Sequence, residues 1–81
     1  MGRAVITVRY FAAAAEAAGV DAEQVPAGSG AAVRADLLAR HPALAPVLDR
    51  CALLADGRRL EASDEVAAGV TLDVLPPFAG G

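Results

Sequence analysis

The sequence has little of what a metal protein or a nucleic-acid-binding protein needs. Its 81 residues include one cysteine and one histidine. This excludes an internal disulfide and the cysteine quartets that hold zinc or iron–sulfur clusters. There is no lysine, and the seven basic residues are scattered arginines outnumbered by ten acidic residues. We therefore expect no metal, no bound cofactor and no nucleic-acid partner, because binding a phosphate backbone requires a basic patch.

Long apolar runs and a targeting segment are also missing. No stretch approaches the roughly 18 apolar residues that cross a bilayer. The alternating pattern of a strand begins within four residues of Met1, which leaves no room for the layout of a signal peptide. We expect a cytoplasmic protein without membrane contact. A hydrophobic content of 56% in 81 residues suffices for one domain with a single core.

The first third of the chain predicts a strand, a short helix and a second strand. Residues 4–11 (AVITVRYF) are β-branched and aromatic, and both faces are largely apolar, which is typical of a central strand. Residues 12–18 (AAAAEAA) favour a helix too short to be stable alone, and Gly19 is placed to end it. Residues 20–26 end in Val-Pro, which favours an extended edge strand.

A main helix and a closing turn are predicted next. The segment Gly28-Ser29-Gly30 breaks the chain, and Ser29 is a suitable N-cap for the helix that follows. Val33, Leu37 and Leu38 recur at helical spacing. The helix should end at His41, because the residue before a proline avoids helical geometry. Residues 42–49 (PALAPVLD) predict another short turn that closes one end of the core.

The last third predicts a hairpin, a loop and a final strand. Residues 51–55 and 58–60 flank Asp56-Gly57, a dipeptide that tolerates the positive φ angles of a tight turn. Residues 64–69 are expected to form a polar loop. Residues 70–75 (VTLDVL) alternate with the period of a strand. The order of elements predicts an α+β fold whose helices lie on one side of a mixed sheet of four to five strands, compatible with a β-grasp.

The chain ends in a segment that should stand clear of the body. Pro76 and Pro77 have no N–H to donate and hold φ near −65°, so they end the strand ladder and project residues 78–81 away from the sheet. Glycine has no Cβ, which lets the backbone of Gly80-Gly81 pass through a narrow tunnel. At an average glycine usage of about 7%, two terminal glycines occur by chance in roughly one chain in 200.

Three segments together resemble the MoaD/ThiS family of ubiquitin-like sulfur carriers. They are VRYFAAAAEAAG near the start, the ADG hairpin, and GVTLDVLPPFAGG at the end. The resemblance covers essentially the whole chain. It implies a ubiquitin-like β-grasp domain at residues 1–75, with one main helix and short helical turns, and a protruding tail at residues 76–81. The tail and the RYFAAAAEAAG opening look most like the carriers that serve as the small subunit of molybdopterin synthase.

The resemblance implies that the working group is the α-carboxylate of Gly81. A ubiquitin-activating-type (MoeB-type) adenylyltransferase would use ATP to convert it to a glycyl adenylate, and a persulfide from a cysteine desulfurase or rhodanese would turn it into a thiocarboxylate. The loaded tail would enter a MoaE-type large subunit and give sulfur to precursor Z in molybdenum cofactor synthesis. The chain would then be a sulfur-carrying subunit, with the active site on its partner.

Partner contacts are expected along the tail, at Pro76, Pro77, Phe78, Ala79 and Gly80. Phe78 is the expected anchor because an exposed aromatic needs a pocket. Cys51 and His41 have structural interpretations: the cysteine starts an apolar strand, and the histidine ends a helix without a catalytic partner. Three alternatives stay open: sulfur carriage for thiamin thiazole or cysteine synthesis, a ubiquitin-like modifier that forms amides with lysines, and a β-grasp binding module without terminal chemistry.

Overall fold

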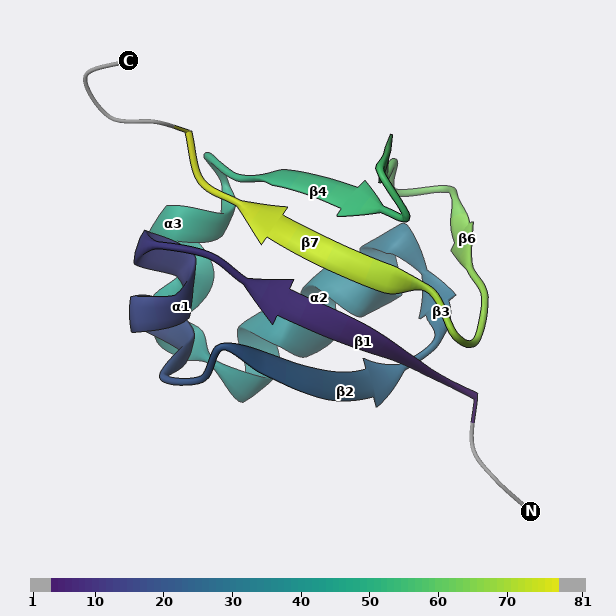
Figure 1. Ribbon diagram of the computed structural model, residues 1–81, viewed down its shortest axis with the longest axis horizontal. Coiled ribbons are helices and arrows are strands. Elements are labelled where there is room, and N and C mark those ends of the chain that lie inside the picture. The colour runs from purple at the N-terminus through teal and green to yellow at the C-terminus, as the bar shows by residue number, and fades with distance from the viewer. Residues whose placement is uncertain (1–3, 78–81) are drawn as a thin grey trace.

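A computed structural model describes residues 4–77 as a mixed sheet with helices packed on one face (Figure 1). In chain order the elements are β1 (Val5–Tyr10), α1 (Ala13–Ala18), β2 (Ala22–Pro26), β3 (Gly28–Ser29), α2 (Gly30–Arg40), η1 (Pro42–Leu44), α3 (Ala45–Leu48), β4 (Ala52–Ala55), β5 (Arg58–Arg59), β6 (Glu65–Val66) and β7 (Thr71–Leu75). The main sheet has five strands in the order β2-β1-β7-β4-β5, and β3 pairs with β6. This is the β-grasp arrangement that the sequence predicts.

Strands β1 and β7 form the centre of the sheet. They run parallel, with Val8 beside Leu72 and Tyr10 beside Val74. Strand β2 pairs with the other side of β1, and β4 pairs with the other side of β7, both in antiparallel fashion. The predictions of a central first strand and a second strand at the sheet edge are therefore confirmed.

The core lies between the sheet and the helices. Apart from the hydroxyl group of Tyr10, its buried side chains are apolar. They are Ile6, Val8, Tyr10, Ala14, Ala18, Val25, Val33, Leu37, Leu44, Leu48, Val66, Leu72 and Val74. Full burial of one such aliphatic side chain stabilises the fold by about 1.5–3 kcal/mol. The predicted closing turn is confirmed by Leu44 and Leu48, which η1 and α3 bury at one end of this core.

The end of α1 and the start of α2 have the capping residues that the sequence predicts. Helix α1 ends at Gly19, which has a left-handed φ of 78° and donates its N–H to the Ala15 carbonyl at 2.8 Å. Helix α2 begins after Ser29, whose Oγ accepts a hydrogen bond from the N–H of Ala32 at 3.1 Å. These bonds satisfy groups that a helix leaves unpaired at its ends. Because α1 has only six residues, it depends on packing through its buried alanines.

The predicted hairpin is present, and a side chain ties it to the central strand. Asp56 and Gly57 have φ angles of 48° and 82°, as a tight turn with two left-handed residues requires. Asp56 Oδ1 accepts a hydrogen bond from the N–H of Thr71 at 3.0 Å. The turn is therefore fastened to the first residue of β7.

The expectation of a polar loop over residues 64–69 is wrong in part. Glu65 and Val66 form β6 and pair with β3, and Val66 is buried. A two-residue strand carries no readable period, which is why the pattern did not reveal it. The same segment holds the start of α2, because the N–H of Gly30 donates to the Asp64 carbonyl at 2.7 Å.

The close approach of the chain to Gly30 can be tested through its effect on stability. A Cβ at this position would collide with the Glu61 backbone carbonyl, whereas a Cβ at Gly28 would make an ordinary contact of 3.6 Å with Ala32. Gly30→Ala should lower the free energy of unfolding by about 1–3 kcal/mol, the usual cost of overpacking. Denaturant unfolding monitored by circular dichroism measures the change.

The matched control for that change is Gly28→Ala, two residues earlier and outside the positive-φ region. It should leave the unfolding free energy within about 0.5 kcal/mol of the parent. Equal effects of the two substitutions would contradict the close approach of α2 to the Glu61 carbonyl.

Candidate functional site

The tail leaves the sheet where β7 ends. The last paired residue of β7 is Leu75, opposite Ala52 at the start of β4. Pro76 is half-buried and Pro77 is exposed. Figure 1 shows this exit at the end of the molecule that carries α1 and α3. Phe78, Ala79, Gly80 and Gly81 lie outside the described residues, so their predicted roles and the expected boundary between domain and tail stay predictions.

A shallow groove lies at this exit, here called the tail-root groove. Its volume is about 420 Å³. Three separate segments line it: α1, the α3 region and the tail root, through Ala13, Pro46, Val47, Arg50, Pro76 and Pro77. Of these six lining residues, the two tail prolines are among the partner contacts that the sequence predicted. The other lining residues carry no pattern of their own, because the fold alone brings them beside the prolines.

The face of the sheet opposite the helices is crossed by a charged pair. Arg9 on β1 donates from Nε and Nη2 to the two carboxylate oxygens of Asp73 on β7, at 2.7 and 2.9 Å. The hydrogen bond and charge of Asp73 raise the pKa of the Arg9 guanidinium. The guanidinium carbon also lies 5.5 Å from the ring centre of Phe11, which is 38% exposed. This pair joins the two central strands on the surface of the sheet.

Cys51 behaves as a packing residue. Its thiol donates to the Val47 carbonyl at 3.3 Å, and its side chain packs against the core. Burial raises the pKa of the thiol, with a smaller opposing effect of the Arg34 charge. A raised pKa disfavours the reactive thiolate. This agrees with the structural interpretation of Cys51.

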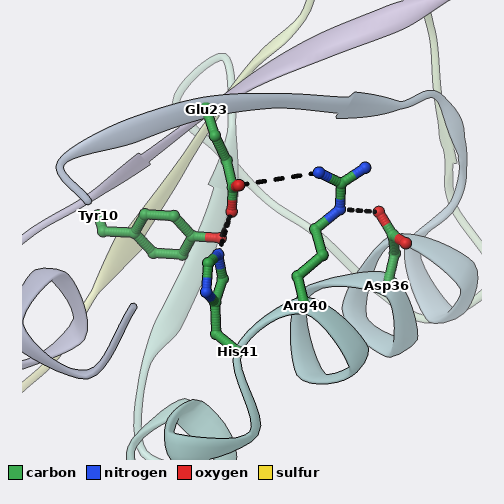
Figure 2. Close-up of polar contacts among 5 residues, drawn as sticks. All are labelled: Tyr10, Glu23, Asp36, Arg40 and His41. Carbon is green, nitrogen blue, oxygen red and sulfur yellow. Dashed lines mark hydrogen bonds and ion pairs between the residues drawn. The ribbon is translucent and has the colours of Figure 1, made fainter. Parts of the chain in front are cut away.

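Glu23 is the centre of a polar network that the sequence did not reveal (Figure 2). The Tyr10 hydroxyl donates to Glu23 Oε2 at 2.6 Å, and Nε2 of His41 lies 2.6 Å from the same oxygen. Arg40 Nη1 lies 3.8 Å from Glu23 Oε1, and its Nε pairs with Asp36 at 2.8 Å. The network joins β1, β2 and the end of α2. His41 therefore has a structural role that its position before a proline did not suggest.

The protonation of Glu23 is set by these neighbours. Burial alone would favour the neutral carboxyl, but hydrogen bonds from Tyr10 and His41 and the charges of His41 and Arg40 outweigh it and lower the pKa of Glu23. Burial, followed by the hydrogen bond to Glu23, raises the pKa of Tyr10. Tyr10 therefore keeps its proton and serves as a donor. The network is a clamp between the sheet edge and α2.

The clamp predicts a pH-dependent stability difference. Because the folded state lowers the pKa of Glu23, its stabilising effect is complete above the unfolded value near 4.3 and is lost as pH falls through the folded value. Glu23→Gln should lower the unfolding free energy by about 1–2 kcal/mol at pH 6. The difference from the parent should shrink toward pH 3, as measured by urea unfolding across this range.

Glu16→Gln is the control for Glu23→Gln. Glu16 is exposed on α1 and makes no side-chain hydrogen bond or ion pair to the residues from 4 to 77. Its substitution should change stability by less than about 0.5 kcal/mol at every pH. A difference for Glu23→Gln that stays constant with pH would contradict the clamp.

Two features are absent from the part of the chain that the structure describes. Between residues 4 and 77, no three His, Cys, Asp or Glu side chains are grouped so that they could hold a metal ion. None of the helices in this range is long and apolar enough to cross a bilayer.

Comparison with protein families gives a match to the ThiS family over residues 8–81. The chain is also 33% identical to a molybdopterin synthase sulfur carrier subunit of Chlamydomonas reinhardtii, over 94% of this chain and 98% of the relative. The family match includes the segments from which the resemblance was inferred.

Two solved structures illustrate the similarity in fold. The crystal structure of SAMP1 from Haloferax volcanii matches with a TM-score of 0.84 and 27% identity, over 95% of this chain and 99% of the other. A putative molybdopterin converting factor subunit 1 from Pyrococcus furiosus matches with a TM-score of 0.82 and 25% identity, over 91% and 98%. These similarities confirm the predicted ubiquitin-like fold.

Proposed function

The chain belongs to the ThiS family and is a ubiquitin-like protein of the sulfur-carrier type, and on this premise we propose that Gly81 carries sulfur as a C-terminal thiocarboxylate. The observation that carries the proposal is the end of β7. A central strand runs into two prolines, and four residues ending in Gly-Gly follow. A rigid body with a narrow terminal arm suits delivery of a reactive group into the active site of another protein.

The proposed reaction starts from the ionised carboxylate of Gly81, whose reference pKa is about 3.3–3.7. A carboxylate oxygen attacks the α-phosphate of ATP, pyrophosphate leaves, and a glycyl adenylate forms. The terminal sulfur of a persulfide on the donor protein then attacks the carbonyl carbon, and AMP leaves. A second thiol of the donor cleaves the resulting acyl disulfide, which leaves a thiocarboxylate on Gly81 and a disulfide on the donor.

The described residues support a division of labour in this scheme. The thiol of Cys51 has a raised pKa, and the carboxylate of Glu23 is engaged by Tyr10 and His41 within the fold. Neither is arranged to activate ATP or sulfur. We therefore assign activation to a ubiquitin-activating-type (MoeB-type) adenylyltransferase, which uses ATP, and sulfur supply to a cysteine desulfurase or rhodanese. The chain itself is a cosubstrate with a covalently carried group, comparable to other group carriers.

Molybdopterin synthesis is the pathway that we propose for the sulfur. Two of the similar proteins support it: the Chlamydomonas relative is named as a molybdopterin synthase subunit, and the Pyrococcus structure as a putative molybdopterin converting factor subunit. In this pathway the tail would enter a MoaE-type large subunit and give sulfur to precursor Z.

Protein modification is the second candidate function. The support is the names of two matching structures from Haloferax volcanii. One is SAMP1, and the other is described as small archaeal modifier protein 1. Adenylation is common to both functions, and only the attacking nucleophile differs: a sulfur atom in one, a lysine amine of a target in the other. The chain has no lysine, so its own side chains could not receive such a bond.

Activation of Gly81 is tested by mass spectrometry. Incubation with ATP, a matching adenylyltransferase and a persulfide donor should add the mass of one oxygen-to-sulfur exchange at the C-terminus. An added alanine after Gly81 should abolish the product, because it moves the carboxylate by about 3.3–3.6 Å and such displacements cost more than about 100-fold in rate. An unchanged mass of the parent chain would refute sulfur carriage.

The pathway needs a separate measurement. Thiocarboxylated protein mixed with a molybdopterin synthase large subunit should convert precursor Z to the dithiolene product, one sulfur per carrier consumed. The unthiolated chain is the control and should give no product. Transfer to a thiazole precursor, or amide-linked conjugates detected by mass spectrometry, would instead support the alternatives.

A further inference from the structure

We propose that the tail-root groove is the docking site of the activating adenylyltransferase, which places an apolar side chain in the groove and a carboxylate against Arg50. This inference rests on the proposed function, because it assumes that an enzyme acts on Gly81. It adds a recognition surface on the body of the protein, at residues outside the tail.

The short reach of the tail supports this location. Four residues follow Pro77 up to Gly81. An extended chain spans at most about 3.6 Å per residue, so Gly81 reaches no farther than roughly 14 Å from Pro77. An enzyme that brings ATP to Gly81 must therefore place its active site within that distance. Since an enzyme is much wider than about 14 Å, its surface also contacts the residues around Pro77, which line the groove.

The groove is suited to an apolar side chain. Its lining is mainly apolar, and three of its six lining residues are prolines. Proline loses almost no side-chain entropy when it is buried, so contact with these rings costs little ordering. Val47 lies on α3, which Leu44 and Leu48 fix to the core on either side. The volume of about 420 Å³ is within the range of preformed binding sites, roughly 300–1,000 Å³.

Arg50 gives the groove its charge. Arg9, Arg34 and Arg40 are each paired with acidic side chains. Arg50 makes no ion pair to the described residues, and its backbone is held by a hydrogen bond from its N–H to the Val47 carbonyl at 3.0 Å. A guanidinium at the rim of an apolar groove favours a carboxylate, which it can bind with two parallel hydrogen bonds. The expected partner feature is therefore an apolar residue beside an Asp or Glu.

Charge reversal at Arg50 tests the electrostatic half of the proposal. The assay is adenylyltransferase-dependent ATP–pyrophosphate exchange as a function of carrier concentration. Arg50→Glu should raise KM for the carrier about 10-fold or more, with kcat within about twofold, because a lost interfacial charge pair of about 1.4 kcal/mol corresponds to a factor of ten. A selective effect on KM separates docking from a general loss of structure.

The matched control for Arg50→Glu is Arg58→Glu. Arg58 is exposed on β5, beyond the opposite end of β4 from Arg50, and makes no ion pair to the described residues. It carries the same change of charge away from the groove, so its KM should stay within about twofold of the parent. Thermal unfolding of both variants checks that they remain folded.

A neutral substitution tests the groove itself. Ala13 lines it, and Ala13→Gln would fill it without adding charge. Ala39→Gln is the control, because Ala39 is an exposed residue on α2 away from the groove. Ala13→Gln should raise KM about fivefold or more through steric exclusion, while Ala39→Gln should not, since surface substitutions of this kind are nearly neutral.

The outcomes separate the two proposals. No exchange with the parent chain would overturn the proposed function, whatever the variants do. Exchange with the parent but unchanged KM in both Arg50→Glu and Ala13→Gln would overturn the docking site alone. A lower KM in these variants would also overturn it, because it would mean that the chain's own tail occupies the groove and competes with the enzyme.

Discussion

The parallel pairing of β1 with β7 is the constraint on which the rest of the structure depends. It joins the beginning of the chain to the end, with Thr7 beside Thr71 and Tyr10 beside Val74. Contacts between residues so far apart in sequence cost loop-closure entropy, so they persist only when the burial of apolar side chains offsets that cost. Here the offsetting burial is on the core face of both strands, where Val8, Leu72 and Val74 are fully buried.

This pairing also explains why the tail has a fixed origin. Strand β7 is paired on both sides, with β1 as far as Val74 and with β4 as far as Leu75, so its end is held more firmly than that of an edge strand. The Arg9–Asp73 pair joins β1 and β7 on the outer face, and the Asp56 carboxylate fixes the start of β7. A group carried beyond Leu75 therefore starts from a rigid point. At the sheet edge, where pairing is one-sided, the Glu23 network holds β2 to α2 instead.

Features with a local signal could be predicted from the sequence. The alternation in β1 and β7, the cap at Ser29 and the turn at Asp56-Gly57 each depend on residues close together in the chain. The paired two-residue strands β3 and β6 were missed because so short a segment has no period. The Glu23 network and the tail-root groove were missed for another reason: their residues come from segments far apart, and only the folded chain brings them together.

The same reasoning bears on how one fold can serve different chemistry. Sulfur carriage and protein modification share a glycyl adenylate and diverge only when sulfur or an amine attacks it. Gly-Gly is equally suited to both, because it presents no side chain that could distinguish between nucleophiles. Under the proposed function, the distinction would then come from the enzymes that bind the carrier, through contacts outside the terminal glycines. Since the tail is short, the surface available for recognition is the part of the body around its root, where the fold brings together residues that no tail motif records.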